Sequence, residues 1–129
     1  MSWDIHFEEA ERLLVVTSHG TLNAEQIRTK SHEIIDAVRR HGVTRVLVDD
    51  RDMQPEIGTV DIYRLPELFN ARELNRGVRA ALVIRPESVK KADYEFLETV
   101  SHNSGYQIRL FTDLDAAQQW LLTQERLTE

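Results

Sequence analysis

The chain has 129 residues, 41% hydrophobic and 29% charged, which is the size and composition of a single globular domain with one core. Its formal net charge of −6 disfavours nucleic-acid binding, because phosphate backbones would be repelled. The sequence has no cysteine, which excludes disulfides and thiolate chemistry, and no apolar run approaches the roughly 20 residues that cross a bilayer, so we expect one soluble, cytoplasmic domain over residues 1–129.

The N-terminal third predicts a β-hairpin followed by an amphipathic helix. Two apolar segments, 4–7 and 13–17, are separated by a charged run and are typical of two strands joined by a polar turn. Asn23 and Gln26 have the spacing of a helix capping box, and basic residues before Gly42 indicate where that helix ends. Its inner face would consist of Ile27, Ser31, Ile34, Ile35 and Val38.

A buried strand is predicted over 43–48, and acidic residues follow it. We expect the strand to end at Asp49, Asp50 and Asp52, with an irregular segment after them. Ligands of open α/β sheets bind beyond the carboxyl ends of strands, and such carboxylates could hold Mg²⁺. The alternative is that these acids only solvate a loop.

The rest of the chain alternates helices and strands. Helical spacing returns over 59–75, where Pro66 predicts two short helices or one bent helix. A strand over 78–84, a helix opening near 86–88, a strand over 107–111 and a final helix capped by Asp113 follow in that order. The face of the helix after 86–88 would consist of Val89, Ala92, Phe96 and Val100. This order predicts an α/β fold with a mostly parallel sheet after an N-terminal hairpin.

The segment from 57 to 69 carries more apolar residues than one face of a short helix can bury. The surplus predicts a lid, a ligand groove, a membrane surface or a dimer contact. The candidate ligand- or partner-binding residues are Ile57, Val60, Tyr63, Leu65 and Phe69. Thr59 is either an N-cap or a phosphate acceptor whose charge the helix N-terminus would stabilise.

No sequence pattern indicates a catalytic centre. The five histidines lack metal-ligand spacing, no serine lies in a G-x-S-x-G motif, and no glycine-rich phosphate loop is present. We therefore predict no catalytic residue, no cofactor and no enzymatic activity.

The order of elements resembles the STAS and SpoIIAA-like superfamily over nearly the whole chain. The residues that carry the resemblance are the strand at 43–48, the helix near Thr59, and the segment 111–121, in which an aromatic strand end precedes a Thr-Asp cap and an Ala-Ala helix with Trp-Leu. Prototypes of this superfamily antagonise anti-sigma factors and are switched by phosphorylation of a serine in an Asp-Ser-Ser-Gly-like motif. Here Ile57-Gly58-Thr59-Val60 occupies that position, without the acidic neighbour and the following glycine.

The resemblance also implies a fold and a class of function. A branch with degenerate motifs is linked to apolar or lipid-like ligands and to membrane association through the segment around this helix. The leading hypothesis is a non-enzymatic regulatory or ligand-binding module for a small apolar ligand, a membrane surface or a protein partner. The alternatives are an interaction switch acting through Thr59 and a metal-dependent enzyme using the three aspartates. A homodimer is a further expectation.

Overall fold

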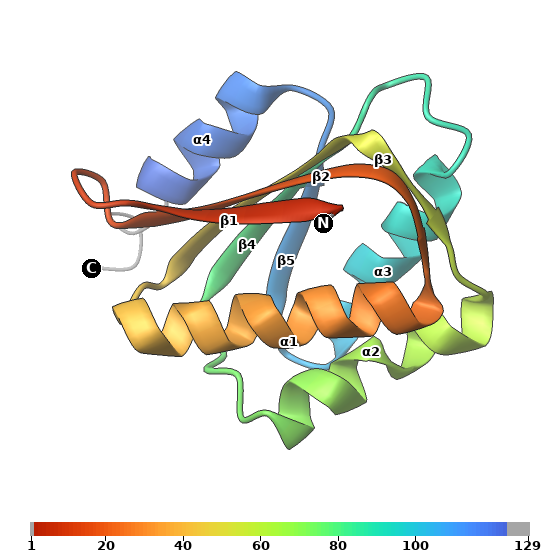
Figure 1. Cartoon of the computed structure of the whole chain (residues 1–129), viewed down its shortest axis with the longest axis horizontal. Helices are drawn as coiled ribbons and strands as arrows, with labels where there is room; N and C mark the ends of the chain where they lie inside the picture. The colour runs from red at the N-terminus through yellow and green to blue at the C-terminus, as the bar shows by residue number, and fades with distance from the viewer. Residues whose placement is uncertain (1, 124–129) are drawn as a thin grey trace.

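The computed structural model describes residues 2–123, which form a five-stranded sheet with four helices (Figure 1). The strands are β1 (Trp3–Glu8), β2 (Leu13–Asn23), β3 (Arg45–Glu56), β4 (Arg79–Val83) and β5 (Gln107–Phe111). The helices are α1 (Ala24–His41), α2 (Thr59–Ala71), α3 (Lys91–Asn103) and α4 (Leu114–Thr123). The sheet order is β1-β2-β3-β4-β5, with β1 antiparallel to β2 and all other pairs parallel. The predicted α/β fold with an N-terminal hairpin and a mostly parallel sheet is confirmed.

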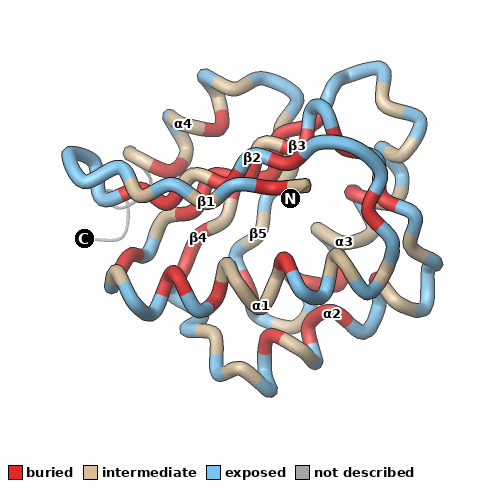
Figure 2. Tube along the Cα trace, viewed as in Figure 1, coloured by how far each residue is buried: buried red, intermediate tan, exposed pale blue. Residues whose placement is uncertain are grey.

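The helices cover the two faces of the sheet unequally. Figure 1 shows α1, α2 and α3 on one side and α4 alone on the other. Residues alternate between these faces along each strand, and buried residues are concentrated along the central strands (Figure 2). The face toward α1 and α3 carries Leu14, Val16, Val46, Val48 and Leu82, and the face toward α4 carries Leu13, Leu47, Ala81 and Val83.

Both ends of α1 have the predicted caps. The Asn23 side chain accepts a hydrogen bond from the Gln26 backbone N–H, and the Gln26 side chain accepts one from the Asn23 backbone N–H, each at 2.9 Å. Gly42 ends the helix with a φ of 63°, a conformation that side chains disfavour. These two caps place α1 along β1, β2 and β3.

The strand β3 is longer than the sequence predicts, because it continues through the acidic residues to Glu56. Strand β2 also continues, to Asn23, and its second half supplies parallel partners for 52–56. Strand β4 stops opposite Asp49, so beyond that point β3 pairs with β2 alone. The Arg85 side chain donates from Nε to the Arg51 carbonyl oxygen at 2.9 Å on the side that β4 leaves open. The expectation that the three aspartates lie in a loop is therefore wrong.

Helix α3 differs from expectation, whereas α2 excludes only the alternative of two short helices. Helix α2 is one helix that contains Pro66, and its N-cap is Gly58. Helix α3 begins only at Lys91, so the predicted helix start is wrong, and of the predicted inner face Val100 is buried whereas Val89 is 81% exposed. A hydrogen bond from the Tyr94 hydroxyl to a buried carboxylate orients α3, so that its inner face consists of Tyr94, Leu97 and Val100. At the C-terminus, the Asp113 carboxylate accepts from the Ala116 backbone N–H at 3.3 Å, and Ala117 and Leu121 are buried as expected.

Candidate functional site

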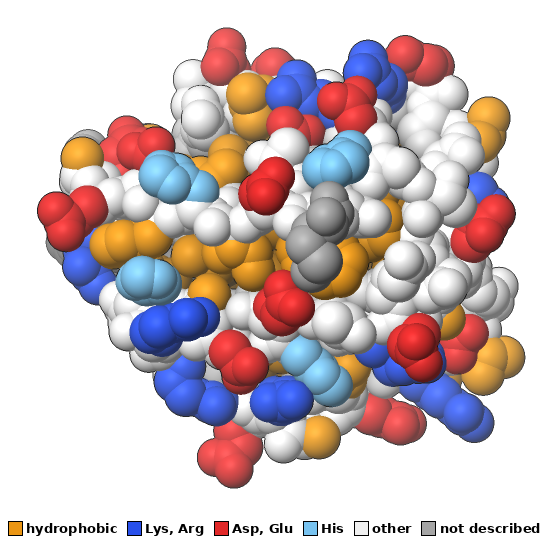
Figure 3. All heavy atoms as spheres, in the orientation of Figure 1, with side chains coloured by type: hydrophobic (Ala, Val, Ile, Leu, Met, Phe, Trp, Pro, Cys, Tyr) orange, Lys and Arg blue, Asp and Glu red, His pale blue; other side chains and the backbone are white. Residues whose placement is uncertain are grey.

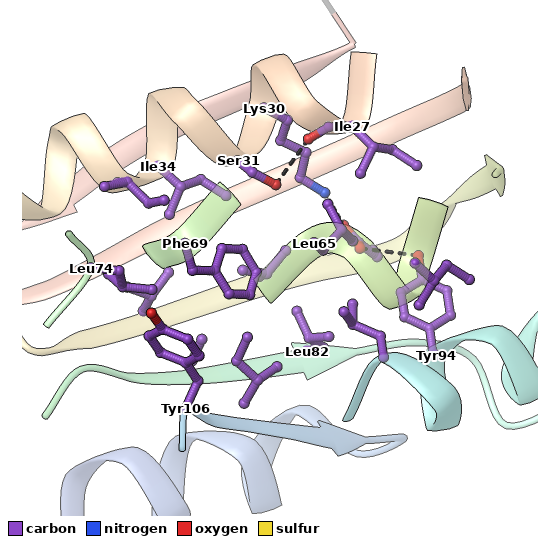
Figure 4. A pocket seen from close by; sticks show the side chains of 18 of the residues that line it. Ile27, Lys30, Ser31, Ile34, Leu65, Phe69, Leu74, Leu82, Tyr94 and Tyr106 are labelled. Carbon is purple, nitrogen blue, oxygen red and sulfur yellow. Dashed lines mark hydrogen bonds and ion pairs between the residues drawn. The ribbon is translucent and has the colours of Figure 1, made fainter. Parts of the chain in front are cut away.

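An apolar cavity lies between the sheet and the helices on its α1 side. The backbone of α1 approaches β1, β2 and β3, and that of α3 approaches β5. Helix α2 packs beside α1 and α3, and within residues 2–123 its backbone approaches no strand. Because α2 is held away from the sheet, its side chains leave a cavity of about 140 Å³ beneath it (Figure 4).

The lining of the cavity is almost entirely hydrophobic. Its sheet side consists of residues from β3, β4 and β5, including Val46, Val48, Ala80, Leu82 and Ile108. Its sides come from α1 and α3, including Ile27, Ile34, Ile35 and Leu97. Its cover comes from α2 and the loop that precedes it, namely Ile57, Ile62, Leu65 and Phe69.

Three polar side chains from three elements meet at one end of the cavity. The Lys30 ammonium on α1 lies 2.8 Å from Oδ1 of Asp50 on β3, and the Tyr94 hydroxyl on α3 donates to Oδ2 of Asp50 at 3.0 Å. All three residues are buried, with exposed fractions of 5% for Lys30, 4% for Asp50 and 6% for Tyr94. Burial and the neighbouring Asp50 carboxylate raise the pKa of Tyr94 well above its ordinary value, so the hydroxyl keeps its proton and donates it.

The opposite end of the cavity is closed by aromatic rings and hydrogen bonds. Figure 4 shows Tyr106 and Leu74 at this end, away from Tyr94 and Lys30. The Tyr106 hydroxyl donates to the Asn70 side-chain oxygen, which also accepts from Arg76 at 2.9 Å. The Arg76 guanidinium lies 4.4 Å from the centre of the Tyr106 ring, and Phe69 packs against the same ring edge to face. These contacts fix the C-terminal end of α2 over the cavity.

The N-terminal half of α2 has no such attachment. Its N-cap, Gly58, offers no side chain to bond the first free N–H groups. Within the described part of the chain, no side-chain hydrogen bond or ion pair joins residues 59–64 to another element. Helix α2 is therefore held at one end by polar contacts and at the other by apolar packing alone.

The structure separates the candidate residues of the 57–69 segment into two groups. Ile57, Leu65 and Phe69 line the cavity. Val60 and Tyr63 are 61% and 64% exposed and lie outside it, so their role as ligand- or partner-binding residues stays a prediction. The separation follows from helical periodicity, which turns positions 62, 65 and 69 inward together and leaves positions 60 and 63 on the outer face.

Thr59 is exposed and is the first residue of α2, so it is not the N-cap. Its hydroxyl is accessible beside the N-terminal amides of the helix. Its role as a phosphate acceptor stays a prediction.

The three aspartates do not form a common site. Asp49 and Asp50 are successive residues of a strand and therefore lie on opposite faces of the sheet. The Arg51 guanidinium bonds both Asp49 oxygens, at 2.9 and 2.8 Å, and holds the pKa of that carboxyl below its ordinary value, while Arg85 pairs with Asp52. Among residues 2–123, no three acidic or histidine side chains are grouped so that they could hold a metal ion.

Lys30 and Tyr94, the two polar partners of Asp50, were not among the residues predicted from the sequence. A signal for Lys30 was present, because it lies three residues after Ile27 and four before Ile34 and so falls on the predicted apolar face of α1. Lysine on such a face indicates either a buried partner or a long side chain that reaches solvent. No local signal marked Tyr94, because the predicted inner face of α3 ran through Ala92 and Phe96 instead.

A second hollow lies on the surface between β1 and α1, where Figure 3 shows hydrophobic side chains flanked by charged ones. Its lining consists of Ile5, Phe7, Glu33, Asp36, Ala37, Arg40 and His41. Phe7 and His41 stack there with ring centres 4.4 Å apart. Because most of its lining can carry charge, this hollow offers no enclosed apolar site.

No helix in the described part of the chain combines the length and the apolar character that crossing a membrane requires.

Comparison with known proteins agrees with the fold. A family model described as SpoIIAA-like matches residues 13–122. A crystal structure of an uncharacterized protein from the DUF3478 family of Shewanella loihica PV-4, which has a SpoIIAA-like fold, superposes with a TM-score of 0.58 at 13% sequence identity and covers 93% of each chain. A search of curated proteins found no match. The family model extends from β2 to α4, and the chain therefore belongs to the SpoIIAA-like family.

Proposed function

We propose that this protein is a non-enzymatic binding module that holds a small apolar ligand in the cavity beneath α2. The observation that carries the proposal is the cavity itself, which is lined by hydrophobic side chains from the sheet, α1, α2 and α3. Well-packed domains rarely leave apolar voids larger than a water molecule, and such voids cost stability. An unfilled apolar pocket of this size, with an aromatic cover, is the default candidate for a binding site.

The size of the cavity limits what it holds in this conformation. Its volume of about 140 Å³ is close to that of an engineered apolar cavity of about 150 Å³ that binds benzene. Pockets for drug-sized ligands have volumes of roughly 300–1,000 Å³. The cavity therefore fits a ring-sized molecule, and a longer lipid-like ligand requires the loosely attached N-terminal half of α2 to move outward.

The outer face of α2 has a different role from its inner face in this proposal. Val60 and Tyr63 are exposed and lie outside the cavity, so they contribute through contact with a membrane surface or a protein partner. Helix α2 thus connects an internal ligand site with an external apolar surface.

The test begins with the purified protein. Native mass spectrometry and organic extraction identify any resident molecule, and titration with toluene, followed by NMR of the methyl groups that line the cavity, measures uptake. Ala80 lies on the sheet side of the cavity, so Ala80→Leu adds three carbons to its interior and should reduce toluene binding at least tenfold.

The matched control is Ala71→Leu, which makes the same change at the exposed end of α2 and should leave binding unchanged. If toluene shifts no lining methyl group and no resident molecule is extracted, the proposal is wrong.

A further inference from the structure

The polar end of the cavity indicates what chemistry its ligand carries. Lys30, Asp50 and Tyr94 all line the cavity and are all more than nine-tenths buried. A ligand that fills the apolar volume therefore has these groups at one end of it. This inference rests on the proposed function, because it concerns the ligand of the same cavity.

The hydrogen-bonding capacity of the Lys30 ammonium is not used up within the protein. An ammonium has three N–H donors. Among the described residues its acceptor is Asp50 Oδ1. A buried donor without an acceptor is costly, and burial at the edge of a cavity leaves these N–H groups to a ligand oxygen or to water.

The charges at this end of the cavity disfavour a charged ligand. The charged residues in the lining are Lys30, Asp50 and the half-buried Asp93. A ligand carboxylate would approach two fixed carboxylates in an apolar space, and a ligand cation would approach the Lys30 ammonium. A ligand carboxylate would have no free counter-ion, since Lys30 and Asp50 already neutralise one another, and a ligand cation would have only the half-buried Asp93, outside that pair.

We infer that the cavity selects a neutral, ring-sized molecule that carries a single hydroxyl or carbonyl oxygen, which accepts a hydrogen bond from the Lys30 ammonium beside Asp50 and Tyr94. A hydroxyl has a further advantage over a carbonyl, because each Asp50 oxygen accepts one protein hydrogen bond and retains capacity for another. The apolar body of the ligand then lies toward Phe69 and Tyr106.

Four probes with the same ring test this inference on the full-length protein: toluene, benzyl alcohol, benzoate and benzylammonium. The decisive quantity is the ratio of benzyl alcohol affinity to toluene affinity, measured by NMR titration. The triple variant K30M/D50L/Y94F replaces the polar group by apolar side chains of similar size, and K91M is the matched surface control. A hydrogen bond to a charged group changes affinity by about tenfold or more. We therefore expect the ratio to fall at least tenfold in the triple variant and to stay unchanged in K91M.

A second measurement in the unaltered protein does not depend on the variant folding. Intermolecular NOEs from the methylene protons of benzyl alcohol should reach the Tyr94 ring, and those from its aromatic protons should reach Phe69. The reverse orientation, with the methylene group against Tyr106, would overturn the inference.

The remaining outcomes separate the two proposals. If toluene binds but the ratio is the same in the triple variant, the polar group selects nothing and this inference fails, while the apolar binding site stands. Tighter binding of benzoate or benzylammonium than of benzyl alcohol also overturns it. If none of the four probes binds, the proposed function itself fails.

Discussion

The Lys30 ammonium lies 2.8 Å from the Asp50 carboxylate in a position where both side chains are more than nine-tenths buried. The two residues come from α1 and β3, and the pair is completed by a hydroxyl from α3. One buried interaction therefore joins three elements that surround the cavity. Its contribution to stability depends on both charges being present, since desolvation offsets much of the attraction between them.

The first prediction concerns the removal of one member of this pair. Lys30→Met leaves the Asp50 charge buried with only the Tyr94 hydroxyl as a partner, and should lower the free energy of unfolding by about 3–5 kcal/mol. The triple variant K30M/D50L/Y94F removes the buried charge as well and should recover most of that loss. Urea unfolding measures the free energy of unfolding of both variants. The control K91M should change that free energy by less than about 0.5 kcal/mol. A K30M variant as stable as the unaltered protein would contradict the burial of this pair.

A second prediction concerns pH. The pKa of Tyr94 is raised in the folded protein, so the folded state keeps a proton that the unfolded state loses near its ordinary pKa of about 10. The unfolded state then binds fewer protons, and stability falls as pH rises above about 10.

Tyr94→Phe removes this group, so the difference in unfolding free energy between the unaltered protein and Y94F should shrink between about pH 9 and pH 11. At neutral pH the Y94F substitution should lower the free energy of unfolding by about 1–3 kcal/mol, because Asp50 loses a hydrogen-bond donor. A difference that is constant across this pH range would show that the Tyr94 hydroxyl ionises normally.

The outer face of α2 gives a third prediction. The double variant V60S/Y63S changes two side chains that lie outside the cavity, so toluene affinity should stay within twofold and the unfolding free energy within about 0.5 kcal/mol. Phe69→Ala, on the inner face of the same helix, should lower stability by about 3–5 kcal/mol. Loss of toluene binding in V60S/Y63S would place these residues at the ligand after all.

The missing side-chain cap of α2 gives a fourth prediction. Gly58 has an extended backbone, with φ of −80° and ψ of 164°, and a Cβ added there would meet no atom within 4 Å. Gly58→Ser therefore supplies a cap without a clash and should stabilise the protein by a few tenths of a kcal/mol.

Amide hydrogen exchange gives the more direct measurement of the same effect. Amides in the first half of α2 should exchange faster than those of α1, whose capping box is complete, and G58S should slow them. Equal protection of both helix starts would contradict the idea that the N-terminal half of α2 is the easier part to open.

The parts of the fold that could be predicted from sequence are those set by local interactions. The Asn23 and Gln26 cap, the Gly42 helix end and the strand at 107–111 depend on neighbouring residues, and each was predicted correctly. The length of β3 could not be predicted from the sequence, because residues 52–56 become a strand only by pairing with the second half of β2. Pairing between distant segments overrides a local pattern that resembles a loop.

The candidate site shows the same division. Ile57, Leu65 and Phe69 could be proposed from the excess of apolar residues in one segment. The polar end of the cavity could not be proposed from the sequence. Lys30 and Tyr94 lie 20 and 44 residues from Asp50 along the chain, and they meet it only when α1, β3 and α3 pack together. The acidic run does not mark a common site, since its three aspartates bind different partners, namely Lys30, Arg51 and Arg85.

The half of β3 that extends beyond β4 bears on self-association. An unpaired strand edge is a template on which a second chain can add its own strand and start aggregation. Here the Arg85 side chain bonds the Arg51 carbonyl oxygen, and Pro55 has no backbone N–H to donate. Both features remove hydrogen-bonding groups that an incoming strand would need. The long strand that brings Asp50 to the cavity thus carries its own protection against edge-to-edge polymerisation.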